Sequence, residues 1–122
     1  EFLEVGGKAV EGSYFSTHFD TEATTTPRAA EFIKAFRAKY GKDPSAFAAL
    51  GYDAYMLVVD AIRRAGSADP KAIRDALAAT KNFEGATGYI TLDQNGDAIK
   101  DAVIRVVKDG KFVYVTTVRP SE

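Results

Sequence analysis

The chain has 122 residues, of which 46% are hydrophobic and 27% charged, and its formal net charge is −1 at pH 7. This size and composition are typical of one globular domain and exclude a disordered or collagen-like chain. The balanced charge offers no basic surface for nucleic acid, and the absence of cysteine excludes disulfides and thiolate metal sites.

The amino-terminal half begins with an expected strand and continues into a helix. Val10 to Phe19 is rich in aromatic and β-favouring residues and predicts the strand. After a Thr-rich connection, Thr26 is placed to cap a helix whose first residue is Pro27, and Gly41 is placed to end it. The apolar residues of this helix fall on one face: Phe32, Ile33, Phe36 and Tyr40.

Two more helices are expected in the middle of the chain. One runs from about Ser45, its cap, to Ala65, and Gly66 stops it. Asp69 and Pro70 begin the next, again as a cap followed by a first-turn proline. The longer helix carries a broad apolar stripe, which consists of Leu50, Ala54, Leu57, Val58, Ala61 and Ile62.

The carboxy-terminal third has the alternating pattern of strands. Tyr89–Leu92 predicts a short strand, and 103–108 with 111–118 predict a hairpin. Asp109 and Gly110 suit a two-residue turn that requires positive φ at both positions. This register forms one apolar face, on which Val106 lies opposite Val113 and Ile104 opposite Val115. It also places Lys108 opposite Lys111.

No pattern in the sequence indicates catalysis or a metal ion. Asp93, Asn95 and Asp97 match the first three ligand positions of a calcium loop, but the twelfth position is Ile104 instead of Glu. An ordinary turn explains the segment better. His18, the one histidine, has no nucleophilic partner motif and is interpreted as a partly exposed strand residue. We therefore expect no enzyme, no catalytic residue, no metal and no cofactor.

The start of the long helix carries aromatic residues that permit two interpretations. The spacing of Tyr52 and Tyr55 by itself favours plain packing. Phe47 stands in the first turn, where side chains often face a cleft, yet its position alone also leaves packing favoured.

The order of the segments resembles a known family along essentially the whole chain. The matching segments are Val10–Phe15, Phe32–Phe36 with Lys39–Gly41, Phe47–Tyr55, Asp75–Leu77, Phe83–Gly85, Gly88–Asp93 with Asn95–Asp97, and Val106–Val113. Together they resemble the carboxy-terminal portion of the periplasmic branched-chain amino-acid-binding proteins. These are the Leu/Ile/Val-binding, type I periplasmic binding proteins of ABC importers.

The resemblance implies an α/β fragment of a two-lobe, flytrap-like fold, with three helices and a carboxy-terminal hairpin. It places residues 1–20 in a second-lobe strand and crossover, 21–102 in the first lobe, and 103–122 in the closing hairpin of the second lobe. It also makes Phe47 the ligand-binding residue, because family members carry a ligand-contacting aromatic just before this helix segment. The groups that hold the ligand's carboxylate and ammonium lie upstream in the family, so we expect no tight leucine binding by this chain alone.

The resemblance also implies partners and a location. The ligand would be a branched-chain or other hydrophobic amino acid, and the partner a membrane permease of the importer. The location would be the periplasm, or outside the cytoplasmic membrane on a lipid anchor; no leader is visible in the sequence. Two alternatives remain: an isolated or engineered fragment that self-associates, at least as a homodimer, through exposed core, or a ligand-sensing receptor domain on the same fold.

Overall fold

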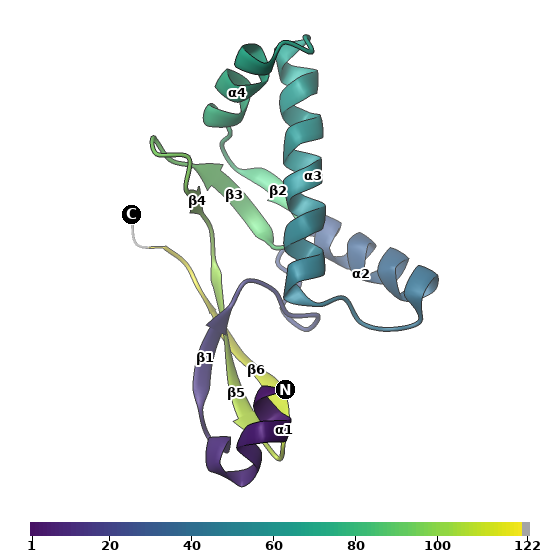
Figure 1. Cartoon of the computed structure of the whole chain (residues 1–122), viewed down its shortest axis with the longest axis vertical. Helices are drawn as coiled ribbons and strands as arrows, with labels where there is room; N and C mark the ends of the chain where they lie inside the picture. Colours follow the sequence, from purple (N-terminus) through teal and green to yellow (C-terminus); the bar gives the residue numbers. More distant parts are fainter. Residues whose placement is uncertain (121–122) are drawn as a thin grey trace.

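The computed structural model describes residues 1–120, which form two parts joined at a narrow waist (Figure 1). One part holds three helices and a small sheet, and the other holds a second sheet with a short helix at the amino terminus. The chain passes between the parts twice, through residues 18–26 and through residues 100–101. This mixture of helices and two small sheets confirms the expected α/β class.

The larger part holds three helices; each begins where the sequence indicates, and the two with a predicted stop also end there. They are α2 (Pro27–Tyr40), α3 (Ala46–Ala65) and α4 (Pro70–Ala78). The side chains of Thr26, Ser45 and Asp69 each accept a hydrogen bond from the backbone N–H three residues on. Gly41 and Gly66 end α2 and α3 in the left-handed conformation that suits glycine. The predicted caps and stops are confirmed.

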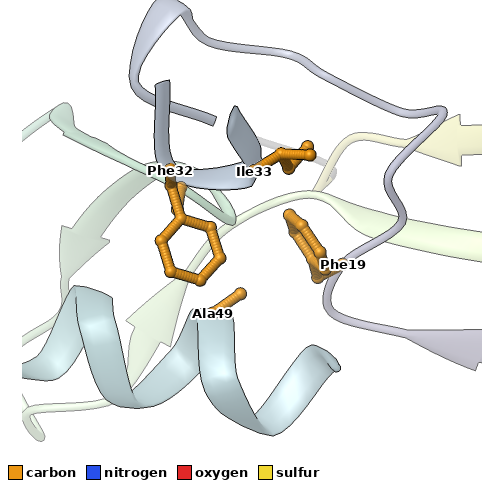
Figure 2. Close-up of a cluster of buried hydrophobic side chains, with 5 residues drawn as sticks. Phe19, Phe32, Ile33 and Ala49 are labelled. Carbon is orange, nitrogen blue, oxygen red and sulfur yellow. The ribbon is translucent and has the colours of Figure 1, made fainter. Parts of the chain in front are cut away.

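An aromatic core closes the larger part (Figure 2). Its buried members come from the first crossing, from α2, from α3 and from the segment after β2: Phe19, Phe32, Ile33, Ala49 and Ala86. Phe32 is 8% exposed and its ring lies 4.7 Å, centroid to centroid, from that of Tyr52. Burying such a side chain contributes about 1.5–3 kcal/mol. The core therefore ties four separate segments into one unit.

The buried face of α3 differs from the predicted apolar stripe. Ala61 is fully buried as expected, but Val58 and Ile62 remain 42% and 40% exposed. The most buried positions include a charged residue, Asp53, which is 2% exposed. The expected stripe is thus partly wrong, because α4, β2 and the core residues of α2 together cover only some sides of a helix that is apolar on more than one side.

The small sheet of the larger part has the strand order β2-β3-β4. These strands are β2 (Phe83–Gly85), β3 (Gly88–Leu92) and β4 (Ala98–Ile99). The strand expected at 89–92 is confirmed, whereas β2 and β4 were not predicted. The carboxylate of Asp93 accepts hydrogen bonds from the backbone N–H groups of Asn95 and Asp97. The segment that resembles a calcium loop is therefore an ordinary turn, closed on itself.

The smaller part is an antiparallel sheet of order β1-β5-β6. Its strands are β1 (Tyr14–Thr17), β5 (Ala102–Lys108) and β6 (Lys111–Val118). The strand expected over Val10 to Phe19 is shorter, since a 3₁₀ helix (η1, Gly7–Val10) precedes it and follows the unpredicted α1 (Phe2–Gly6). Asp109 and Gly110 have φ of 53° and 68°, which confirms the predicted hairpin turn.

The hairpin register follows the prediction near the turn and departs from it beyond. Val106 lies opposite Val113, and the two lysines at the turn also face each other, as expected. The pairing of Ile104 with Val115 is wrong, because a β-bulge places Thr116 opposite Ile104 and leaves Val115 unpaired. A bulge adds one residue to one strand, which no alternation of apolar residues reveals.

The two faces of this second sheet are covered unequally. On one face, Val103 and Val107 are 5% and 1% exposed, and Phe112 stacks on Phe2 of α1. The other face carries Tyr14, 68% exposed, beside a shallow hollow shared with residues of the hairpin: Val106, Val113 and Val115. Among residues 1–120, no helix combines the length and the apolar character needed to cross a membrane.

Candidate functional site

Phe47 lies in the first turn of α3 with an open side chain. Ser45 caps the helix by accepting a hydrogen bond from the N–H of Ala48, so the backbone that carries Phe47 is fixed. The ring itself is 84% exposed. Within residues 1–120, no aromatic ring packs on it and it lines none of the hollows described below. The Phe47 ring is therefore held on a fixed backbone and, within the described chain, is open to contact with another molecule.

The two tyrosines that follow Phe47 have different environments. Tyr52 is half-buried and packs on Phe32, which confirms the packing interpretation for this residue. Tyr55 is 69% exposed, so packing within the described chain does not explain it. The first half of α3 therefore carries two exposed aromatic rings, Phe47 at its start and Tyr55 at its end.

Asp53 is the polar centre of the larger part, and sequence reasoning gave it no role. Its carboxylate accepts hydrogen bonds from the backbone N–H groups of Ala86 and Thr87, at 2.6 and 2.8 Å, and from the Thr87 hydroxyl at 2.6 Å. A Cβ added at Gly85 would lie 2.7 Å from this carboxylate, so glycine is needed there. The signal in the sequence was a charge within the otherwise uncharged first two-thirds of α3, since the other charges of this helix begin at Asp60.

Lys100 reaches the same network from the second crossing. Its ammonium group donates a hydrogen bond to the hydroxyl oxygen of Thr87. Burial lowers the pKa of Lys100 below its ordinary value of 10.5, and the charges of Asp53 and Asp101 only partly oppose this shift. The network thus connects α3, the turn between β2 and β3, and the crossing.

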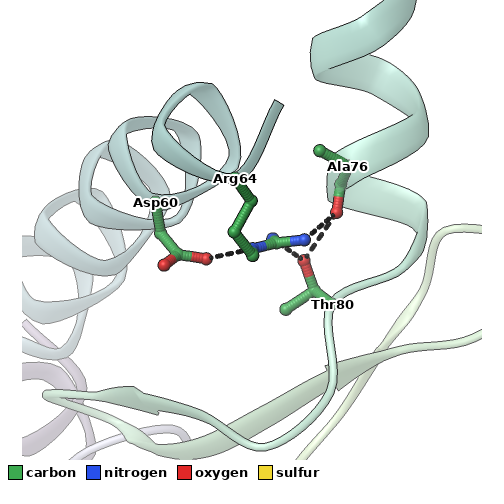
Figure 3. A network of polar contacts seen from close by, with 4 residues as sticks. All are labelled: Asp60, Arg64, Ala76 and Thr80. Carbon is green, nitrogen blue, oxygen red and sulfur yellow. Dashed lines mark hydrogen bonds and ion pairs between the residues drawn. The ribbon is translucent and has the colours of Figure 1, made fainter. Parts of the chain in front are cut away.

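A polar hollow of about 430 Å³ lies between the start of α2, the end of α3 and β2. Arg64 in its wall bonds the carboxylate of Asp60, the carbonyl of Ala76 and the hydroxyl of Thr80 (Figure 3). These contacts fasten α3 to the end of α4 and occupy the guanidinium group. Arg28 also lines the hollow, and its guanidinium lies 5.8 Å from the centre of the Phe83 ring. The polar residues that line this hollow therefore serve mainly to hold α3 and α4 together.

A second hollow is aromatic and lies between α2 and α3. Its walls come from Phe32, Phe36, Tyr40 and Tyr52, with Lys39 above the ring of Tyr40 at 5.3 Å. The charged side chains that line this hollow are those of Glu31 and Lys39. Within residues 1–120, no group of His, Asp and Glu side chains is arranged to hold a metal ion. His18 is exposed in the bend that follows β1, so its interpretation as a strand residue is wrong. The aromatic rings in this hollow are therefore best explained by packing of α2 against α3.

Comparisons of the sequence with a family profile and with known proteins indicate the same family. The sequence profile of the periplasmic binding protein family matches residues 1–111. The Leu/Ile/Val-binding protein homolog 2 of Brucella abortus is 30% identical over 118 residues, which cover 93% of this chain and 31% of the relative. The chain thus spans about a third of the length of the curated relatives it matches.

Two solved structures extend the similarity to the fold. The leucine-binding protein LivK of Thermotoga maritima is 47% identical with a TM-score of 0.88, covering 97% of this chain and 34% of that one. LivJ of Streptococcus pneumoniae, a branched-chain amino acid transporter substrate-binding protein solved with isoleucine, is 38% identical with a TM-score of 0.77. That match covers 88% of this chain and 30% of LivJ. The chain belongs to the periplasmic binding protein family, a family of binding proteins and not of enzymes.

Proposed function

We propose that this chain is part of the substrate-binding component of an ABC-type importer for branched-chain or other hydrophobic amino acids. The observation that carries the proposal is the 47% identity and TM-score of 0.88 with a leucine-binding protein over nearly the whole chain. The isoleucine bound to LivJ supports the same ligand class. Among residues 1–120, no group of side chains is arranged as a metal site, and the hollows are lined mainly by packing residues, which is compatible with a binding role.

The two parts of the chain correspond in this proposal to portions of two lobes. Residues 21–102 would belong to the first lobe, and residues 1–20 with 103–122 to the second; residues 121 and 122 lie outside the described residues. Support comes from the sheets, because β1, β5 and β6 form one sheet while β2, β3 and β4 form another. A ligand would be held where the lobes face each other, and its binding would favour the closed arrangement.

Phe47 is the proposed ligand contact in this chain. Its open ring on a capped helix suits an apolar side chain of an amino acid, since such contacts need area and no new hydrogen bond. The partner would be a membrane permease and the location extracytoplasmic, either in the periplasm or on a lipid anchor. A sensory receptor on the same fold would use the same contact, so it differs in partner and not in ligand chemistry.

A chimera tests the proposal. The segment of Thermotoga maritima LivK that matches this chain is replaced by residues 1–122, and leucine binding is measured by calorimetry. We expect binding by the chimera and none by the isolated chain at tens of micromolar, because unpaired ligand charges cost several kcal/mol. Phe47→Ala in the chimera should weaken binding about tenfold, or about 1.4 kcal/mol.

Tyr55→Ala is the matched control, since it removes another exposed aromatic ring from the same helix. It should leave the affinity unchanged. A folded chimera that binds no hydrophobic amino acid would contradict the proposed function, and equal affinities of the chimera and its Phe47→Ala variant would contradict the role of Phe47.

Self-association is the second candidate role, and the uncovered sheet face favours it. Tyr14, Val115 and Val118 are 68%, 43% and 50% exposed, and each apolar side chain of this size gains about 1.5–3 kcal/mol when covered. Pairing of two copies through this face would cover it. Sedimentation of the isolated chain at tens of micromolar distinguishes the roles: a monomer that unfolds cooperatively would rule out association as the source of its stability.

A further inference from the structure

The two parts of the chain touch each other very little. Every substantial contact between helices and strands lies within one part or the other. A small hollow at the waist has walls from both parts, which include Phe19, Ala86, Val103 and Thr117. Small interfaces of this kind permit relative motion unless specific contacts restrain it. Any restraint at the waist must therefore come from few side chains.

One ion pair crosses the waist. Asp20 lies in the first crossing, directly after the core residue Phe19, and is 4% exposed. Its Oδ2 lies 2.7 Å from Nε of Arg105, which is on β5, the central strand of the smaller part. The N–H does not point straight at the oxygen, so the contact is an ion pair and not an aligned hydrogen bond.

Both members of the pair have further contacts, Asp20 within the crossing and Arg105 within the sheet. The other carboxylate oxygen of Asp20 accepts a hydrogen bond from the N–H of Glu22, at 2.8 Å, in the turn that starts the crossing. Arg105 donates a hydrogen bond to the carbonyl of Phe112 at 3.3 Å and lies 5.2 Å from the centre of the Phe112 ring. If the sheet and the crossing moved apart, each side chain would have to give up these contacts to keep the ion pair.

The remaining polar contacts do not share this role. Lys100 in the second crossing bonds Thr87, and Thr26 bonds the carbonyl of Gly85, so both tie a crossing to the larger part alone. The other ion pairs among residues 1–120 also lie within one part. Within the described chain, Asp20 with Arg105 is thus the one polar side-chain contact that ties the first crossing to the sheet β1-β5-β6, next to Phe19 in the core of the larger part.

We propose that the Asp20–Arg105 ion pair sets the orientation of the sheet β1-β5-β6 relative to the helical part. Arg105 acts as a positioning residue: it holds the crossing against the sheet and restricts rotation at the waist. Asp20 is buried and Arg105 is partly buried, so loss of the charge on either residue leaves the other with little solvent to replace its partner, and the waist should rearrange to expose it. The inference concerns the free chain and does not depend on the proposed ligand.

Distances between two spin labels measure this orientation directly. The chain has no cysteine, so Lys71→Cys on α4 and Lys111→Cys at the hairpin turn create one labelling site in each part, both at exposed positions. Pulsed electron paramagnetic resonance should give one narrow distribution of label distances for this labelled chain. Asp20→Asn should broaden it or shift its mean, since the amide keeps the shape of the side chain and removes the charge.

Two further variants make the result interpretable. Arg105→Lys keeps the positive charge and should broaden the distribution less than Asp20→Asn; it also decides the question if Asp20→Asn unfolds. Asp60→Asn breaks an ion pair that lies wholly within the larger part, and it should leave the distribution unchanged. A distribution that is already broad in the parent chain, or that stays the same in folded Asp20→Asn and Arg105→Lys, would overturn the proposal.

Discussion

The helical part and the sheet part of this chain close their cores to very different degrees. In the helical part, Phe19, Phe32 and Ile33 are 5–8% exposed and are held by segments far apart in the sequence. In the sheet part, Val103 and Val107 are buried, while one face remains open. A three-stranded sheet with one short helix can cover only one face, whereas helices packed on a sheet enclose a core.

This difference bears on the proposed function. The helical part has an enclosed core and fixes the backbone of Phe47, although Val58 and Ile62 of α3 stay partly exposed, while the sheet part has one face that the described residues do not cover. The comparison therefore predicts that equal changes in the two parts will have unequal effects on stability.

Truncating one phenylalanine in each part should give the largest difference. Phe32→Ala should lower the free energy of unfolding by about 3–5 kcal/mol, because the ring is buried among other rings. Phe112→Ala should cost about 1–2 kcal/mol, since its half-buried ring loses less contact area. Urea unfolding followed by circular dichroism measures both, and equal losses would contradict the comparison.

Removing the buried carboxylate should have the next largest effect. Asp53→Ala leaves the N–H groups of Ala86 and Thr87 without acceptors, at about 1–3 kcal/mol for each buried donor. We expect a total loss of about 2–4 kcal/mol in the same unfolding assay. Asp60→Ala is the matched control: its carboxylate is on the same helix but pairs with Arg64 at the surface, so its removal should cost no more than about 1 kcal/mol.

The smallest expected effect is a change in pH dependence. The pKa of Lys100 is lowered in the folded chain, so between the lowered pKa and the ordinary value of 10.5 the unfolded chain binds more protons than the folded chain does. The contribution of Lys100 to the free energy of unfolding should therefore rise with pH in this alkaline range. Below this range, the full cost of burying the charged Lys100 side chain is present. Lys100→Met removes this slope.

The measurement is the difference in unfolding free energy between the parent chain and Lys100→Met, taken from about pH 8 to about pH 10. This difference should shift in favour of the parent as the pH rises. Lys42→Met, at an exposed position, should show no such trend. A difference that does not change with pH would show that burial of Lys100 has no effect on its titration.

The features that sequence alone could predict depend on neighbouring residues. Thr26, Ser45 and Asp69 cap helices through hydrogen bonds three residues on, and Gly41 and Gly66 end helices through their own backbone conformation. These signals need no knowledge of the fold. The hairpin turn at Asp109 and Gly110 is equally local, and all three helices and the turn were predicted correctly.

The features that sequence missed depend on residues far apart. Asp53 meets Thr87 across 34 positions, and Arg105 meets Asp20 across the waist. The bulge at Val115 is defined by the partner strand, and β2 and β4 are too short to show a period. For the site, Phe47 came from family resemblance alone; the structure adds that its ring is open, and its contact with a ligand stays a prediction.

Hydrogen exchange of the free chain, followed residue by residue by NMR, tests the inequality of the two parts most directly. The amides of Ala86 and Thr87, which bond the buried carboxylate of Asp53, and those of α3 should exchange only with global unfolding. The paired amides of β5 and β6 should exchange faster, through local opening of the half-covered sheet. Equal protection in both parts would contradict the account, because it would show that the sheet part is as completely stabilised as the helical part.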